Sequence, residues 1–288
     1  EVMGVVGMGA RRWVDLGLFQ LQPSEVMKIA LVLALARFYH GLPLEEVGRM
    51  RNLVFPVVLI MVPVALVMRQ PDLGTAILLL ATAMAILLLA GVRLWKFAVL
   101  FGTILAAIPV AWRFMLHGYQ KDRVLTYLNP ERDPLGAGYH IMQSKIALGS
   151  GGLFGKGFMQ GTQSHLAFLP ERQTDFIFTM LAEEFGLIGC LGLLSLYILV
   201  IAYGYAIALR SQNQFGRLLA AGMITTFFLY VFINMAMVMG LIPVVGVPLP
   251  LVSYGGTSMM SLLIGFGLIL SVYVHRDVTI ARRPSYGN

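Results

Sequence analysis

Charged residues are scarce in this chain. Only 12% of its 288 residues are Asp, Glu, Lys or Arg, whereas 58% are hydrophobic, and the mean hydropathy is +0.80. Soluble domains usually carry about 25% charged residues, so the composition excludes an ordinary soluble fold and predicts a protein of the bilayer. The net charge of +7 does not indicate nucleic-acid binding, because the basic residues fall in short connectors between apolar runs and form no basic stripe.

Cysteine is almost absent as well. The single cysteine, Cys190, lies in an apolar run, so there is no disulfide framework and the redox compartment cannot be read from it. No His and Cys residues are spaced as zinc ligands. A Walker A phosphate loop is also missing, because Ser150 stands where its first glycine would be and Lys156 is followed by glycine.

Long apolar runs dominate what is present. A membrane helix needs about 20 largely apolar residues, and seven runs qualify: 23–40, 53–69, 73–91, 95–116, 176–209, 216–242 and 257–275. The fifth is too long for a perpendicular crossing, so we expect it to tilt or to begin in the interface. Residues 1–9 look like the tail of another apolar helix without a basic signal-peptide segment before it, which indicates a truncated N-terminus. We therefore expect an all-α polytopic membrane protein in which residues 1–288 form one membrane domain.

The basic residues give the expected orientation. They follow every second span: Arg49 and Arg51, Arg93 and Lys96, Arg210 and Arg217, then Arg276, Arg282 and Arg283. The positive-inside rule places these connectors and the C-terminus in the cytoplasm. The connectors 9–22, 70–72, 117–175 and 243–256 then face outward.

The outer segment 117–175 is unusually long, and connectors of that length are usually functional. Within it, residues 143–148 are expected to form a short helix. A glycine-rich run follows, for which two interpretations remain open: an anion-binding nest near Lys145 and Lys156, or a flexible connector.

The stretch LPERQTDFIFTMLAEEFG, residues 169–186, joins this segment to the fifth span. Ionisable residues at a membrane boundary indicate a functional site, and Asp175 lies there beside Glu171 and Arg172. The structural alternative is a helix start in which Asp175 favours the helix dipole and Thr174 is the N-cap. Glu183 and Glu184, about two turns further on, are expected to form structural ion pairs.

Two other charged pairs are predicted on the same outer face. Glu25 and Lys28 are three residues apart in the first span, where the alternative is a surface ion pair of little energetic value. Arg69 and Asp72 lie between the second and third spans, with Asp72 close to the start of the third, where the alternative is an N-terminal cap.

The outer connector 240–258 contains three prolines and four glycines, which forbid a continuous helix. Non-helical backbone at membrane depth is tolerated only where it is buried or lines a cavity. Asn234, shortly before it, adds a polar group that we expect to face inward.

These residues together resemble the SEDS family, the proteins of shape, elongation, division and sporulation. The similarity rests on RRWVDLG (11–17), QPSE (22–25), QPDLG (70–74), DPLGAGYHIMQSKIALGSGG (133–152), LPERQTDF (169–176), and Asn234, Gly240, Pro243 and Gly246 with the SYGGTS run. The match runs nearly end to end and is most similar to the elongation branch, RodA, rather than to the division branch, FtsW. The family has ten spans, so about three would be missing from the start.

The resemblance implies a peptidoglycan glycosyltransferase of the bacterial inner membrane, with its active site facing the periplasm. Such an enzyme polymerises lipid II and works with a class B penicillin-binding protein, which crosslinks the strands. The family's essential aspartate corresponds to Asp175, and Lys28 and Asp72 line the same cavity.

The implied reaction needs a general base to take a proton from the attacking sugar hydroxyl, and we expect Asp175 to be that base. The pyrophosphate leaving group calls for cations, for which the candidates are Lys28, Arg12, Arg123, Lys145 and Lys156. Further expected substrate contacts are Glu25, Glu171, Arg172 and Ser253. A divalent cation, Mg²⁺ or Mn²⁺, on Asp175 or Asp72 would also neutralise the pyrophosphate.

The alternative function is a lipid II flippase or another transporter, which intramembrane charges and broken helices would also suit. A transporter needs polar groups accessible in turn from both sides, whereas these charged residues gather on the outer side. A passive scaffold would leave them without a role.

Overall fold

The structure is a computed structural model that describes residues 5–7, 10–15, 17, 20–70, 72–114, 118, 121, 125, 127, 137–162 and 173–281. The chain forms two compact units, which we describe separately. The first comprises Glu1–Arg93, Leu199–Leu229 and Gly255–Asn288, and the second comprises Leu94–Ile198 and Tyr230–Tyr254.

The first unit begins with three short antiparallel strands, in the order β1 (Val5–Gly7), β2 (Ala10–Asp15) and β3 (Gln20–Leu21). The helix tail expected over residues 1–9 is therefore wrong for the part that the structure describes. Val6 pairs with Arg11 of β2 instead. β-branched valines favour strands, and glycine disfavours a helix interior.

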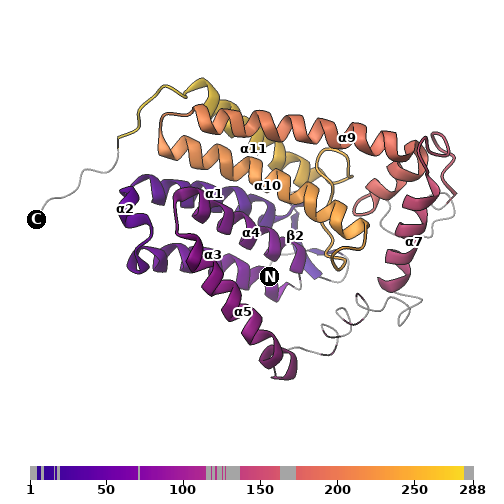
Figure 1. Cartoon of the computed structure of the whole chain (residues 1–288), viewed down its shortest axis with the longest axis horizontal. Helices are drawn as coiled ribbons and strands as arrows, with labels where there is room; N and C mark the ends of the chain where they lie inside the picture. The colour runs from indigo at the N-terminus through magenta and orange to yellow at the C-terminus, as the bar shows by residue number, and fades with distance from the viewer. Residues whose placement is uncertain are drawn as a thin grey trace, which may run out of the picture. The chain divides into compact units, whose positions relative to one another are not determined.

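The helices of the first unit follow the predicted runs closely. They are α1 (Pro23–His40), α2 (Leu44–Val47), α3 (Met50–Arg69), α4 (Leu73–Ala90) and α11 (Gly256–Val274). Figure 1 shows α1 beside α4, and α1 packs against α3, α4 and α11. Pro23 begins α1 at a position where its missing N–H has no intrahelical acceptor.

Small and hydroxylated residues allow the helices of this unit to approach closely, as in other membrane bundles. A Cβ on Gly222 of α10 (Gln214–Val238) would lie 2.7 Å from a methyl carbon of Val32. Thr82 and Thr226 share a buried hydrogen bond of 3.3 Å between α4 and α10. The buried faces of α1 and α4 thus form a core with this part of α10.

The second unit contains α5 (Leu94–Phe114), α7 (Ala137–Ser150), the start of α9 (Ile177–Arg210) and the end of α10. The short helix expected over residues 143–148 is confirmed as part of α7. The long fifth run also forms a helix, but Gly186, with φ 65° and ψ −161°, interrupts it. The excess length is therefore divided by a break in the backbone, which the sequence did not predict.

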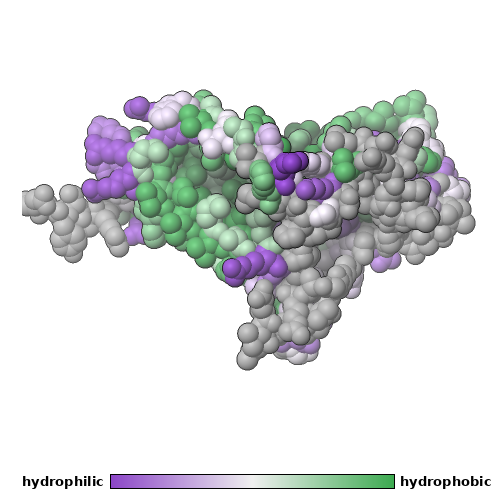
Figure 2. Space-filling model, turned by 90° about the horizontal axis from the view of Figure 1, so that it is seen from below, coloured by the Kyte–Doolittle hydropathy of each residue, from purple (hydrophilic) through white to green (hydrophobic). Residues whose placement is uncertain are grey.

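Within the described residues, each predicted span corresponds to one long helix, in chain order α1, α3, α4, α5, α9, α10 and α11. Six of them have the length and composition of a membrane crossing; α1, which carries Glu25, Lys28 and Arg37, is not among the six. Large apolar side chains are exposed along α3 and α9, for example Phe55 and Leu199. On the part of the face that Figure 2 draws in colour, hydrophobic residues gather in a patch, as expected of helices that contact lipid.

Candidate active site

Asp175 lies in the turn that precedes α9, and its side chain is partly buried. The turn is attached to the connector between α10 and α11. Asn234 of α10 donates through Nδ2 to the backbone carbonyls of Asp175, at 2.8 Å, and Val247, at 2.7 Å. One amide group therefore ties the backbone of the aspartate to the connector.

Ser253 attaches the same turn at a second place. Its hydroxyl donates to the carbonyl of Thr174 at 2.5 Å and accepts from the backbone N–H of Leu249 at 2.7 Å. The N–H of Tyr254 donates to the carbonyl of Gln173 at 2.9 Å. Three consecutive carbonyls, of residues 173–175, are thus bound by the connector and Asn234, which fixes where the Asp175 side chain begins.

Gly246 leaves space beside the carboxylate. It adopts φ 69°, and a Cβ built on it would lie 3.4 Å from Oδ2 of Asp175. A side chain at this position would contact that carboxylate oxygen, whereas glycine does not. The connector therefore holds the backbone of the aspartate and places a residue without a side chain beside its carboxylate.

Helix α7 packs on the same unit through a buried serine. Ser144 donates to the carbonyl of Val238 at 2.8 Å and shares a hydrogen bond of 2.9 Å with Thr179 of α9. The neighbouring Lys145 is exposed, and a Cβ on Gly240 would lie 2.3 Å from its Cε. The sequence-predicted Lys145 thus extends over the start of the connector that holds Asp175.

The glycine-rich run is neither an anion nest nor a flexible connector. We call Gly151–Gly157 the glycine turn. The N–H groups of Gly155, Lys156 and Gly157 donate to the carbonyls of Gly151, Glu183 and Glu184 respectively. These donors are therefore not available to an anion, and the turn is fixed on α9.

Lys156 forms an ion pair with Glu183 at 2.7 Å, and both groups contact the hydroxyl of Thr162. The Glu183 side chain is only 1% exposed. The expectation of a structural pair is confirmed for Glu183, and the predicted contact of Lys156 with substrate stays untested.

Glu25, Lys28 and Asp72 form a second cluster, in the first unit. The Lys28 ammonium donates to Oε1 of Glu25 at 2.6 Å, and Asp72 is near enough for its charge to act on Lys28. All three residues are buried. The alternative of a surface ion pair is thus wrong, because burial on α1 removes both partners from water.

Asp72 caps α4, as its alternative interpretation predicted. Its carboxylate accepts from the N–H of Thr75 at 3.1 Å and from the Thr75 hydroxyl at 3.0 Å. Capping does not exclude an electrostatic role for Asp72, since its negative charge also attracts the Lys28 ammonium.

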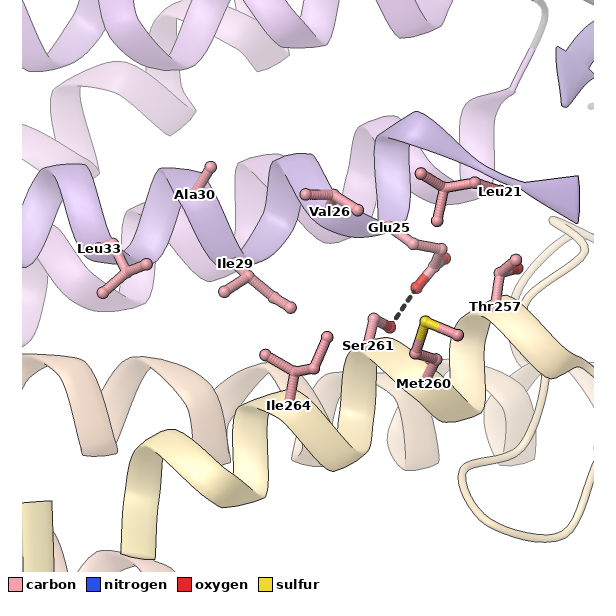
Figure 3. Close-up of a pocket in the computed structure, with 10 residues that line it drawn as sticks. All are labelled: Leu21, Glu25, Val26, Ile29, Ala30, Leu33, Thr257, Met260, Ser261 and Ile264. Atoms are coloured by element: carbon pink, nitrogen blue, oxygen red, sulfur yellow. Dashed lines mark hydrogen bonds between the residues drawn. The ribbon is translucent and has the colours of Figure 1, made fainter. Parts of the chain in front are cut away.

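A pocket of about 190 Å³ lies beside Glu25, between α1 and α11. Figure 3 shows Ser261 of α11 donating to Oε2 of Glu25, at 2.9 Å, with apolar side chains such as Ile29 and Ile264 along the rest of the wall. Sequence reasoning missed Ser261. Its only signal is a hydroxyl in an apolar helix, which does not say what it contacts.

The remaining predicted residues lie at the edge of the described structure or beyond it. Arg12 belongs to strand β2, but its side chain is not described, and Arg123, Glu171 and Arg172 lie outside the described residues. Asp175 is in the second unit and Lys28 and Asp72 are in the first. A cavity shared by all three stays a prediction.

The described residues give limited support for a metal. Among them, no group of three His, Cys, Asp or Glu side chains is placed to hold one. Both carboxylate oxygens of Asp72 already accept hydrogen bonds from Thr75. We therefore derive no reaction step through a metal ion.

Comparisons with known proteins agree on one family. Residues 1–278 match the FtsW/RodA/SpoVE family, described as cell cycle proteins. The peptidoglycan glycosyltransferase MrdB of Escherichia coli is 51% identical over 280 residues, which are 96% of this chain and 75% of that protein.

Solved structures are similar throughout the chain. A chain from a peptidoglycan synthase complex, described as coordinating polymerization and crosslinking, has a TM-score of 0.80 and 35% identity and matches 96% of this chain and 76% of its own. The rod shape determining protein RodA of Thermus thermophilus has a TM-score of 0.68 and 31% identity, over 96% and 74% of the two chains. With its apolar helices, the chain is thus a multi-pass membrane protein that belongs to the FtsW/RodA/SpoVE family.

Proposed function

We propose that the chain is a peptidoglycan glycosyltransferase that polymerises lipid II into glycan strands during cell elongation. The observation that carries the proposal is the way Asp175 is held. Its backbone is bound by Asn234, the preceding residues are bound by the connector, and Gly246 places no side chain against its carboxylate. The names of the relatives, peptidoglycan glycosyltransferase MrdB among them, support the same reaction.

In the proposed reaction, Asp175 accepts the proton of the acceptor sugar hydroxyl. The hydroxyl oxygen forms a bond to the anomeric carbon of the donor, while the bond from that carbon to the pyrophosphate oxygen breaks. The electron pair leaves with undecaprenyl pyrophosphate, and the α-linked donor becomes a β-linked product. A fixed carboxylate suits this step, because a general base must stay within hydrogen-bond reach of the proton that it removes.

The leaving group requires positive charge near its oxygens. We propose that Lys145 supplies part of it, since this exposed cation lies against Gly240 at the start of the connector that holds Asp175. Lys28, which pairs with Glu25 and lies near Asp72, is the second proposed cation, from the first unit. A divalent cation shared by Asp175 and the pyrophosphate stays a prediction.

We also propose the location and the partner. The active site faces the periplasm, the C-terminus lies in the cytoplasm, and the membrane is the bacterial inner membrane, which the pattern of basic connectors supports. The proposed partner is a class B penicillin-binding protein that crosslinks the strands. The similarity to a chain of a synthase complex that coordinates polymerization with crosslinking supports such a partner.

The test is lipid II polymerisation by the protein with its penicillin-binding partner, for the unaltered chain, Asp175→Asn and Glu184→Gln. Glu184 is a matched control: a partly exposed carboxylate nine residues further along the chain. General-base catalysis contributes about 10²–10⁴-fold, so Asp175→Asn should reduce the rate at least about 100-fold, and Glu184→Gln should not.

Equal rates for Asp175→Asn and the unaltered chain would contradict the assignment of the base. Lipid II translocation across vesicles, without polymerisation by any of the three proteins, would instead show the transporter.

A further inference from the structure

The glycine turn is inserted into the hydrogen-bond ladder of α9. In a continuous helix the carbonyls of Glu183 and Glu184 would accept from the N–H groups four residues further on. Here they accept from Lys156 and Gly157 of the turn, at 3.0 Å each. At the break, N–H groups of the turn therefore replace the N–H groups that the helix itself would donate to these two carbonyls.

The other side of the ladder is completed in the same way. The N–H groups of Leu187 and Ile188, which the break at Gly186 releases, donate to the carbonyls of Gly152 and Leu153, at 2.9 and 3.2 Å. Four reciprocal hydrogen bonds thus satisfy the backbone groups on both sides of the break. Backbone exposed to lipid must be satisfied internally in this manner, whereas a loop in water has no such need.

The side chains on this segment are apolar and exposed. Leu153, Phe154, Phe158 and Met159 are 61%, 79%, 70% and 63% exposed. The nearest charge, Lys156, is turned toward the buried Glu183. In water, exposing four large apolar side chains while the one cation of residues 151–159 is paired with a buried carboxylate would be unfavourable.

These side chains continue the lipid-facing surface of α9. The ring of Phe158 lies 6.1 Å from that of Phe185, and Leu187, Ile188 and Leu191 are also about half exposed on the helix that follows. Within an 18-residue apolar stretch of α9, only 11% of the residues are buried. The exposed residues of the turn and of α9 thus belong to one apolar surface.

The length of α9 places the turn at the membrane boundary. From Leu187 to its basic end at Arg210 the helix has 24 residues, or about 36 Å at 1.5 Å per residue. The hydrocarbon core is about 30 Å thick, and the polar interfaces extend it to about 40–45 Å. A membrane crossing by a helix of this length would place the break, and the turn bound to it, in the interface opposite the basic end of the helix.

We propose that Gly151–Met159 is an interfacial membrane anchor, with Phe154 and Phe158 inserted at the boundary between headgroups and acyl chains of the leaflet opposite Arg210. The ligand of this surface is lipid. Aromatic and leucine side chains are the residues that amphipathic segments bury at this depth. The role is separate from the proposed sugar transfer and does not depend on it.

The experiment measures depth with a nitroxide label. In a Cys190→Ala background, single cysteines replace Phe154 or Phe158, and the labelled full chain is reconstituted in vesicles of phosphatidylethanolamine and phosphatidylglycerol. Collisions with oxygen, which concentrates in lipid, are compared with collisions with a nickel chelate, which stays in water. Leu199→Cys is the lipid control and Asp277→Cys the water control, because their side chains are 65% and 73% exposed.

At both test positions, the ratio of the collision rate with oxygen to that with the nickel chelate should exceed the Asp277 value several-fold. It should approach the Leu199 value. Ratios equal to the Asp277 value would overturn the anchor and would point to a surface that a partner protein covers. Low collision rates with both reagents would also overturn it, because they would mean that the chain itself buries these side chains.

Discussion

The contact between the glycine turn and α9 can be tested with two alanine substitutions that differ in one respect. Gly152 and Gly155 both have positive φ, 54° and 79°, so alanine at either position costs about 1–2 kcal/mol of backbone strain. A Cβ on Gly152 meets nothing within 4 Å, whereas a Cβ on Gly155 would lie 2.1 Å from the carbonyl oxygen of Glu184. Gly152→Ala is therefore a control for the strain alone.

The additional cost at Gly155 follows from distances. Ordinary contact begins at 3.4 Å, so the turn must move away from α9 by 3.4 − 2.1 = 1.3 Å. That shift lengthens the hydrogen bonds to Glu183 and Glu184, now 3.0 Å each, beyond hydrogen-bond range. Each is worth about 1 kcal/mol in water and more in lipid, so Gly155→Ala should lose about 3–4 kcal/mol in all.

The assay is thermal unfolding in detergent, followed by a thiol-reactive dye at Cys190, which lies in α9 four residues beyond the break. At roughly 2–4 °C per kcal/mol for a chain of this size, Gly155→Ala should lower Tm by about 6 °C or more. Gly152→Ala should lower it by only about 2–8 °C, the shift expected on the same scale from the strain alone, so Gly155→Ala should lower Tm about two to three times as far. Equal shifts in the two variants would refute the close backbone contact.

Three further predictions concern the site and its supports. Asn234→Ala should lower both the rate of polymerisation and the free energy of unfolding, the latter by about 2–3 kcal/mol, because one buried and one part-buried carbonyl lose their donor; an active variant with unchanged Tm would contradict the role of the amide. Lys156→Met should destabilise the protein by about 3 kcal/mol, because Glu183 keeps its buried charge without this cation, and the added Glu183→Gln should restore most of the loss in the same melting assay; no recovery would refute the pairing. If a divalent cation takes part, excess chelator should abolish polymerisation and added Mg²⁺ or Mn²⁺ should restore it, and full activity in chelator would exclude the cation.

The sequence predicted the features that depend only on residues close together in the chain. Apolar runs located the long helices to within a few residues, because each run is long enough to cross a bilayer. The capping role of Asp72 was also an open alternative, since it depends only on residues within one turn, and the structure places Thr75 there.

What the sequence could not predict depends on contacts between distant residues. The insertion of the glycine turn joins residues 151–157 to residues 183–188 through backbone atoms, which leave no pattern of side chains. Ser261 meets Glu25 across 236 positions. The spacing of Glu25 and Lys28 indicated a pair on one helix face, but their burial follows from packing with other helices.

The break in α9 also bears on the height of the proposed reaction above the membrane. Between the start of the helix at Ile177 and the break lie nine residues, 177–185, or about 13–14 Å of helix at 1.5 Å per residue. The polar interface is only about 5–8 Å deep on each side. With the proposed anchor at lipid level and residues 177–185 along the membrane normal, this segment would hold the proposed base, Asp175, beyond the lipid phosphates and near the sugars, while the substrate's lipid tail stays in the bilayer.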